Sequence, residues 1–197
     1  MQIKSLIFAF SLLISSSFIF AQSTETPWKV DKSHSSVGFT VTHLMISEVS
    51  GNFKDYDIQV SSTKPDFSDL KVTANIKVAS INTENTQRDE HLRGDDFFNA
   101  ASFPEIKFVS VAVKKIDEKH YKIIGNLSIR DVTKSVTFDA VYNGSIKSPW
   151  GNTVAVWKAS ASINRTDYNL KWNKALEAGG VTVSNEVAMN LVIEMSK

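Results

Sequence analysis

Apolar and polar residues alternate over most of this chain, and a period of two is the pattern of a β-strand with one buried face. Turn signals such as Asn143-Gly144 and Gly179-Gly180 separate the alternating stretches. About eight or nine strands can be counted, with almost no helix, which predicts an all-β barrel or sandwich. The long strands reach both ends of the chain and favour a single antiparallel barrel of about eight strands, because closure removes exposed sheet edges.

The alternation changes phase at one place in the first half of the chain. Phe53 has the opposite parity to Tyr56, Ile58 and Val60, which belong to the same apolar stretch. Because one extra residue in a strand shifts the phase, this change predicts a β-bulge.

One long stretch, residues 88–108, does not alternate. A capping-box-like start at Thr86 predicts a short helix of about two turns. Gly94 is its expected end, because glycine tolerates the left-handed turn that often follows a helix. A second helical turn would then carry Phe97 and Phe98, whose rings need an apolar surface to cover. The stretch therefore predicts a short helical segment that closes one end of the barrel.

The N-terminus has the pattern of a secretory signal peptide. Lys4 supplies the positive charge, residues 6–20 are apolar apart from small serines, and Ala21 suits the position before a cleavage site. The apolar run is short for a membrane span, although a retained N-terminal anchor is the alternative. We expect residues 1–21 to be a cleaved signal peptide and residues 22–197 to form one domain in the periplasm, or secreted, without stable membrane insertion.

Composition and spacing exclude several classes of function. Removal of the signal peptide would leave 21 basic and 21 acidic residues, and a neutral chain without basic clusters argues against a nucleic-acid partner. The sequence has no cysteine, which excludes thiolate catalysis and cysteine-based metal sites. The four histidines show neither H-x-H nor H-E-x-x-H spacing, and no G-x-S-x-G motif is present. We therefore expect no catalytic residue, no metal site and no cofactor.

The apolar faces of the strands predict the wall of the barrel interior. His43 shares its parity with Phe39 and Val41, so it either faces the interior and donates to a ligand or is a rim histidine with a local hydrogen bond. The interior itself is either an open lumen or a filled core. Three alanines share one strand face with Trp157, and such small side chains favour a lumen with room for a ligand.

Four groups of residues, in this order, resemble signatures of the YceI-like family. They are His34-Ser35, Val37, Phe39, Val41 and His43-Leu44; Arg88, His91-Leu92, Asp96-Phe97-Phe98, Pro104, Ile106 and Phe108; Gly125, Leu127-Ser128-Ile129-Arg130 and Val132-Thr133-Lys134; and Ile163, Arg165, Tyr168, Gly180-Val181 and Glu186-Val187. The chain departs from the family at Asp131, Ser135 and Asn169, where Gly, Pro and Gly are frequent. All three positions lie at predicted turns, so the departures concern loop shape.

The resemblance implies a lipocalin-like β-barrel of the bacterial periplasm that binds polyisoprenoid lipids and related amphiphiles. The expected partner is then an isoprenoid quinone, a polyprenol-like lipid or another long-chain amphiphile held in the lumen. The candidate lumen residues are Phe39, Val41, His43, Ile76, Phe97, Phe98, Phe108, Leu127, Phe138, Trp157, Ala159, Ala161, Met189 and Leu191. The alternatives are a secreted filled-barrel interaction or stress protein, and a hydrolase of periplasmic amphiphiles. A homodimer is left open.

Overall fold

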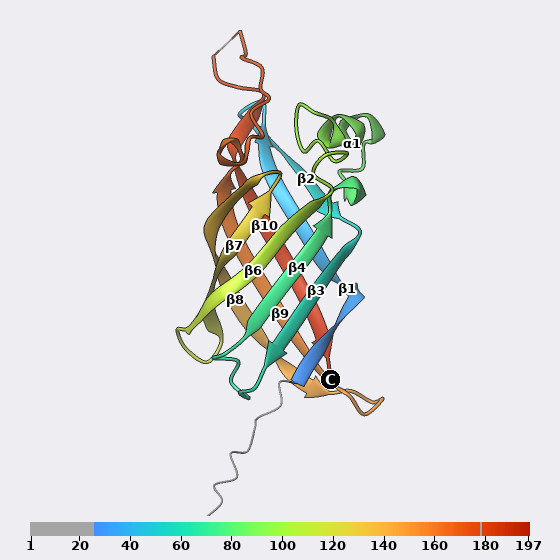
Figure 1. The fold of residues 1–197 in the computed structure, drawn as a ribbon, viewed down its shortest axis with the longest axis vertical. Coiled ribbons are helices and arrows are strands. Elements are labelled where there is room, and N and C mark those ends of the chain that lie inside the picture. The colour runs from blue at the N-terminus through green and yellow to red at the C-terminus, as the bar shows by residue number, and fades with distance from the viewer. Residues whose placement is uncertain (1–25, 178) are drawn as a thin grey trace, which may run out of the picture.

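The computed structural model describes residues 26–177 and 179–197, and the predicted signal peptide lies outside these residues. Eight strands of this part form one closed antiparallel barrel, in which the last strand pairs with the first (Figure 1). In barrel order they are β1 (Thr26–His43), β3 (Tyr56–Ser62), β4 (Lys71–Lys77), β6 (Glu105–Lys115), β7 (His120–Ile129), β8 (Val132–Lys147), β9 (Thr153–Asn164) and β10 (Val183–Ser196). The predicted all-β barrel of about eight strands is confirmed.

Two further strands extend one edge of the sheet beyond β1. β2 (Ser47–Phe53) pairs with the second half of β1, and the two-residue β5 (Ile81–Asn82) pairs with the end of β2. β3 pairs with the beginning of β1 instead. The bulge predicted between Phe53 and Tyr56 is therefore wrong. The phase changes there because the chain leaves one strand and enters another, with Lys54 and Asp55 between them.

The predicted helix is present as α1 (Thr86–Arg93), which lies over the upper end of the barrel in Figure 1. Its cap differs from the prediction, because the side chain of Asn85 accepts the hydrogen bond from the Arg88 amide. Gly94 ends the helix as expected, but with a φ of −74° it is not left-handed. Its amide donates to the carbonyls of Glu90 and His91 instead.

Turns rather than a second helical turn follow α1. We call residues 86–103, which comprise α1 and these turns, the lid segment. Two short 3-10 helices complete the structure: η1 (Val78–Ser80) precedes β5, and η2 (Arg165–Tyr168) follows β9. η2 and the loop after it lie at the same end of the barrel as α1 (Figure 1).

Aromatic side chains close the opposite end of the barrel. Phe67 in the β3–β4 loop is only 4% exposed, and its ring contacts Trp28, Tyr142 and Trp157 at centroid distances of 5.2 to 5.6 Å. The ring of Tyr121 packs against the indole of Trp157 at a centroid distance of 4.9 Å. These five rings form what we call the aromatic floor.

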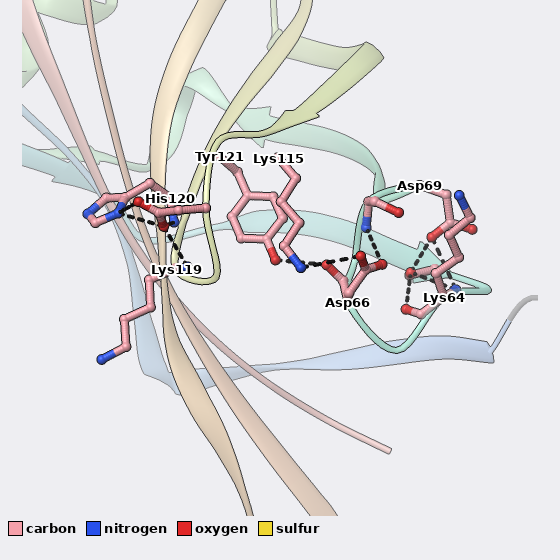
Figure 2. A network of polar contacts seen from close by, with 10 residues as sticks. Lys64, Asp66, Asp69, Lys115, Lys119, His120 and Tyr121 are labelled. Carbon is pink, nitrogen blue, oxygen red and sulfur yellow. Dashed lines mark hydrogen bonds and ion pairs between the residues drawn. The ribbon is translucent and has the colours of Figure 1, made fainter.

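A polar network holds the loop that carries Phe67 (Figure 2). The hydroxyl of Tyr121 donates to the carbonyl of Asp66 at 2.7 Å, and Lys115 forms an ion pair with the Asp66 carboxylate at 3.3 Å. Asp69 accepts hydrogen bonds from Ser62 and Thr63. The floor is thus tied to the β6–β7 hairpin and to the end of β3, which fixes the depth of the barrel interior.

Candidate functional site

An apolar cavity of about 220 Å³ occupies the interior between the aromatic floor and the lid segment. It is lined by every barrel strand, by the lid segment and by the residues after β9. Its wall comprises Val37, Gly38, Phe39, Val41, Phe53, Ile58, Val60, Leu70, Val72, Ala74, Ile76, Leu92, Phe97, Phe98, Ile106, Phe108, Ile123, Leu127, Ile129, Phe138, Ala140, Trp157, Ala159, Ile163, Arg165, Leu170, Val183, Val187, Met189, Leu191, Ile193 and Met195. Arg165 is the only ionisable residue in this wall, which contains no hydroxyl, carboxylate or imidazole.

Twelve of the fourteen lumen residues predicted from the sequence lie in this wall. His43 and Ala161 are not part of it. His43 sits at the end of β1, after a register irregularity that follows Val41, and its carbonyl accepts from the Ser47 hydroxyl. Ala161 is half-buried and packs against the core. Strand alternation therefore identified wall residues on most strands and was wrong at His43, where the pairing is irregular. Ala161 shares the inner face of β9 with Ala159 and Ile163 but does not line the cavity.

Sequence reasoning missed the one charged wall residue, Arg165. Its side chain is buried, and Nε donates to the Ser184 carbonyl at 2.8 Å. Nη1 donates to the carbonyls of Leu170 and Trp172 at 2.5 and 2.9 Å, and Nη2 donates to Val183. Burial lowers the pKa of this guanidinium. The sequence did contain a signal for it. Arg165 follows Ile163 in the alternation of β9, and an arginine at such a position is unusual because arginine is mostly exposed.

Arg165 therefore has a structural task. Four backbone carbonyls take up its donors, so that it joins η2 and the following loop to the start of β10. Buried polar groups are stable only when they are hydrogen-bonded, and these bonds provide that compensation without a carboxylate partner. The wall consequently offers a ligand apolar contact almost everywhere.

The lid segment contributes two phenylalanines to the wall. Phe97 is 7% exposed, and its ring lies 5.0 Å from the His91 ring and 5.3 Å from that of Trp172. Phe98 is half-buried and meets Phe53 edge-on at 6.1 Å. Both rings cover the upper end of the barrel, as the sequence predicted.

Arg130 fastens the lid segment to its surroundings. This residue lies in the β7–β8 turn, and its Nη1 donates to the carbonyls of Phe97 and Asn169, each at 3.0 Å. The guanidinium also lies over the ring of Phe103 at 5.2 Å. The lid segment and η2, which are far apart in sequence, therefore share one anchor.

The cavity is less enclosed at the lid than at the floor. In β10, Ile193 and Met195 near the floor are buried, whereas Val187 and Met189 near the lid are only half-buried. Their partners in β1, Val41 and Phe39, are also half-buried. A molecule that entered the cavity from the lid end would displace turns and side chains. A molecule that entered from the floor would have to break the packed aromatic cluster.

None of the helices in the described residues has the length and apolar character needed to cross a membrane.

The family model of the YceI-like domain matches residues 28–195. A UPF0312 protein of Staphylococcus aureus (strain MSSA476) is 40% identical over 172 residues, which cover 87% of this chain and 98% of the relative.

Solved structures show the same fold. The YCEI protein of Campylobacter jejuni is 34% identical, with a TM-score of 0.70 over 85% of this chain and 95% of that one. BcnA of Burkholderia cenocepacia is 21% identical, with a TM-score of 0.73 over 84% of this chain and 99% of its own. A polyisoprenoid binding domain from Saccharophagus degradans is 13% identical, with a TM-score of 0.60 over 87% and 98% of the two chains. With its matching signatures, closed barrel and apolar interior, the chain belongs to the YceI-like family.

Proposed function

We propose that this protein binds and carries a long-chain isoprenoid lipid, such as an isoprenoid quinone or a polyprenol, or a related amphiphile, inside its barrel. The observation that carries the proposal is the apolar cavity of about 220 Å³. Protein interiors contain few voids larger than a water molecule, and apolar cavities of such size stay dry and accept apolar ligands. A filled-barrel interaction protein does not need this space.

The chemistry of the wall favours a hydrocarbon chain over a polar ligand. Burial of an isoprenoid chain is favourable by roughly 25 cal/mol per Å² of apolar surface removed from water, and it needs no directional contact. Backbone carbonyls engage the guanidinium of Arg165, so we do not assign it to the head group. The head group of the lipid would lie at the lid end, because the cavity is less enclosed there than at the floor. The fold is shared with a domain named for polyisoprenoid binding, which supports the same ligand class here.

The wall also favours binding over catalysis. Hydrolysis of an amphiphile needs a nucleophile, a general base and a group that stabilises the developing charge. The wall has no serine, cysteine, histidine or carboxylate. The alternative hydrolase reading therefore has no catalytic group inside the cavity to support it.

Export to the periplasm is part of the proposal. Its support is the sequence pattern of Lys4, the apolar run and Ala21, in residues outside the described part of the chain. N-terminal analysis of the protein from its own host tests it. A mature chain that begins at Gln22 supports export, and a chain that still begins at Met1 contradicts it.

The substitution Ala159→Phe tests the lumen directly. Ala159 lines the cavity on β9, whereas the neighbouring Ser160 is exposed on the outer face. In an open lumen the new ring occupies ligand volume, so lipid retention falls while the melting temperature hardly changes. In a filled core it overpacks, which costs typically about 1–3 kcal/mol. Ser160→Phe is the matched control, since it adds the same ring outside the barrel.

Two measurements read the outcome. Native mass spectrometry of the parent, purified from its own host, should show a co-purifying lipid, and Ala159→Phe should carry markedly less of it than Ser160→Phe. Thermal unfolding of all three proteins shows whether the fold is intact. Strong destabilisation of Ala159→Phe with unchanged lipid retention would count against the lumen and favour the filled-barrel alternative.

A further inference from the structure

Three metal-ligating side chains meet on the outside of the barrel, at the seam between its first and last strands. Asp31 of β1 stands directly opposite Glu194 of β10 in the antiparallel register. The next paired residues are Ser36 and Val192, so that four residues of β1 face the single Ile193. This three-residue insertion brings His34 back over the carboxylates.

The donor atoms of the three side chains lie within 4.8 Å of one another. Nδ1 of His34 is 2.9 Å from Oδ2 of Asp31 and 3.8 Å from Oε1 of Glu194. Metal–ligand bonds of about 2.1 Å place neighbouring ligand atoms roughly 3–3.5 Å apart. The observed distances bracket that spacing, so small side-chain rotations suffice to surround an ion.

The imidazole of His34 can compensate at most one of the two negative charges. Carboxylates directly opposite each other on two strands destabilise a sheet. Across residues 26–177 and 179–197, no lysine or arginine forms an ion pair with Asp31 or Glu194. A divalent cation would neutralise both carboxylates at once, which the imidazole of His34 alone does not do.

The surrounding hydrogen bonds orient the carboxylate of Asp31 and hold the backbone of Glu194 in place. The amide and hydroxyl of Ser33 donate to Oδ1 of Asp31 at 2.8 and 2.6 Å, which leaves Oδ2 for the site. The hydroxyl of Ser35 donates to the carbonyl of Glu194 and accepts from its amide. Such supporting contacts are typical of metal sites, where their loss costs about 10–100-fold in affinity.

We propose that Asp31, His34 and Glu194 form a binding site for a divalent transition metal, with zinc as the best match. One imidazole and two carboxylates suit zinc better than the all-oxygen ligand sets of calcium or magnesium. Three protein ligands leave a fourth position for water. Because the ligands come from β1 and β10, the ion would clamp the seam at which the barrel closes.

The chain contains its own matched control in the β6–β7 turn. Asp117 and His120 have the same i,i+3 spacing as Asp31 and His34, and Nδ1 of His120 lies 2.9 Å from the Asp117 carboxylate. Both histidines are exposed. Asp117 and His120 have no third ligand atom nearby. Within the described residues, the geometry of a metal site is found only for Asp31, His34 and Glu194.

The test uses the tag-free protein, stripped of metal with EDTA and titrated with zinc chloride in a calorimeter. We expect one zinc ion per chain and a rise in melting temperature with zinc, because a ligand that binds only the folded state stabilises it. His34→Gln and Glu194→Gln should weaken binding at least tenfold and abolish the thermal shift. Ser33→Ala should weaken it by about tenfold or more.

His120→Gln should bind zinc like the parent. Far-UV circular dichroism confirms that each variant is folded, and all four substitutions lie at exposed or half-exposed positions. The absence of binding to the parent would overturn the proposal. Equal binding by His34→Gln and the parent would overturn it as well, and so would a loss of binding in His120→Gln.

Discussion

The ring of Phe67 stands edge-on against the indole of Trp157, with centroids 5.3 Å apart and an interplanar angle of 87°. Phe67 lies in the β3–β4 loop and Trp157 on β9, next to the floor end of the barrel. Edge-to-face pairs of this kind contribute beyond the area they bury. The contact closes one end of the barrel, so the cavity has a floor and the lid segment covers the opposite end.

Removal of this floor should destabilise the protein strongly. Phe67→Ala should lower the free energy of unfolding by about 3–5 kcal/mol, because a buried ring is lost from a packed aromatic cluster. For a domain of this size each kcal/mol corresponds to roughly 2–4 °C in melting temperature. Calorimetry measures the shift. Phe67→Leu is the control and should lose less; equal melting temperatures for the alanine variant and the parent would refute the floor.

The two phenylalanines of the lid segment should respond differently. Phe97 is buried against His91 and Trp172, so Phe97→Ala should cost about 3–5 kcal/mol of unfolding free energy. Phe98 is half-buried, so Phe98→Ala should cost less and mainly speed the release of bound lipid. Chemical unfolding and the exchange rate of a bound isoprenoid measure the two effects. If both variants match the parent in both measurements, the lid assignment is wrong.

Asn169 should tolerate glycine better than alanine. This residue ends η2 with a left-handed φ of 62°, and its Nδ2 donates to Oδ1 of Asp131 at 3.2 Å. Alanine pays roughly 1–2 kcal/mol in the left-handed region, whereas glycine does not. Asn169→Ala should therefore unfold at lower denaturant concentration than Asn169→Gly. Both variants lose the hydrogen bond to Asp131, so the comparison isolates the backbone contribution. The reverse order would contradict a preference set by the left-handed backbone conformation.

Acid should weaken the loop that carries Phe67. The side chains of Ser62 and Thr63 donate to Asp69 and hold the pKa of its carboxyl well below the ordinary value of 3.8. Because the pKa is lower in the folded state, the ionised carboxylate stabilises the fold above pH 3.8. This contribution is lost as the pH falls from there through the folded-state pKa.

Thermal unfolding at pH 6 and pH 3 tests this prediction. The parent should lose more stability between the two pH values than Asp69→Asn does. Asp57→Asn is the control, since Asp57 is an exposed carboxylate on the outer face of β3. If Asp69→Asn and Asp57→Asn show the same difference between pH 6 and pH 3, Asp69 does not carry the acid sensitivity.

The alternation of apolar and polar residues, with the predicted lid segment, was enough to predict the class of fold and twelve residues of the cavity wall. The period-two alternation indicates which side chains share a strand face. In a closed barrel one face of each strand points to the interior, so the apolar face can be assigned to it. The face of β9 that carries Trp157 and Ala159 could therefore be assigned to the interior from the sequence alone. The position of α1 was also predicted, because a helix-ending glycine is a local signal, although Asn85 rather than Thr86 provides the cap.

Where strand pairing is irregular, the register between strands determines which side chains are exposed, and periodicity alone does not predict it. Val109 and Val111 share the parity of Val113, yet they are 47% and 61% exposed, because the pairing of β6 with β7 shifts between Ser110 and Ala112. Likewise, the phase change after Phe53 marks a passage between strands and not a bulge. The sequence pattern of a strand indicates which residues share a face. Irregularities in the pairing depend on the neighbouring strand as well, so the pattern of one strand does not predict them.

Contacts between distant segments depended entirely on the tertiary structure. Asp31 and Glu194 become neighbours only because the last strand pairs with the first. Arg165 is stable inside the barrel only because backbone carbonyls from the loop after η2 and from β10 accept its hydrogen bonds. Closure of the barrel brings Asp31 and Glu194 together, although they lie near opposite ends of the chain. The loop between β9 and β10 sets the second arrangement, because it returns its carbonyls to Arg165.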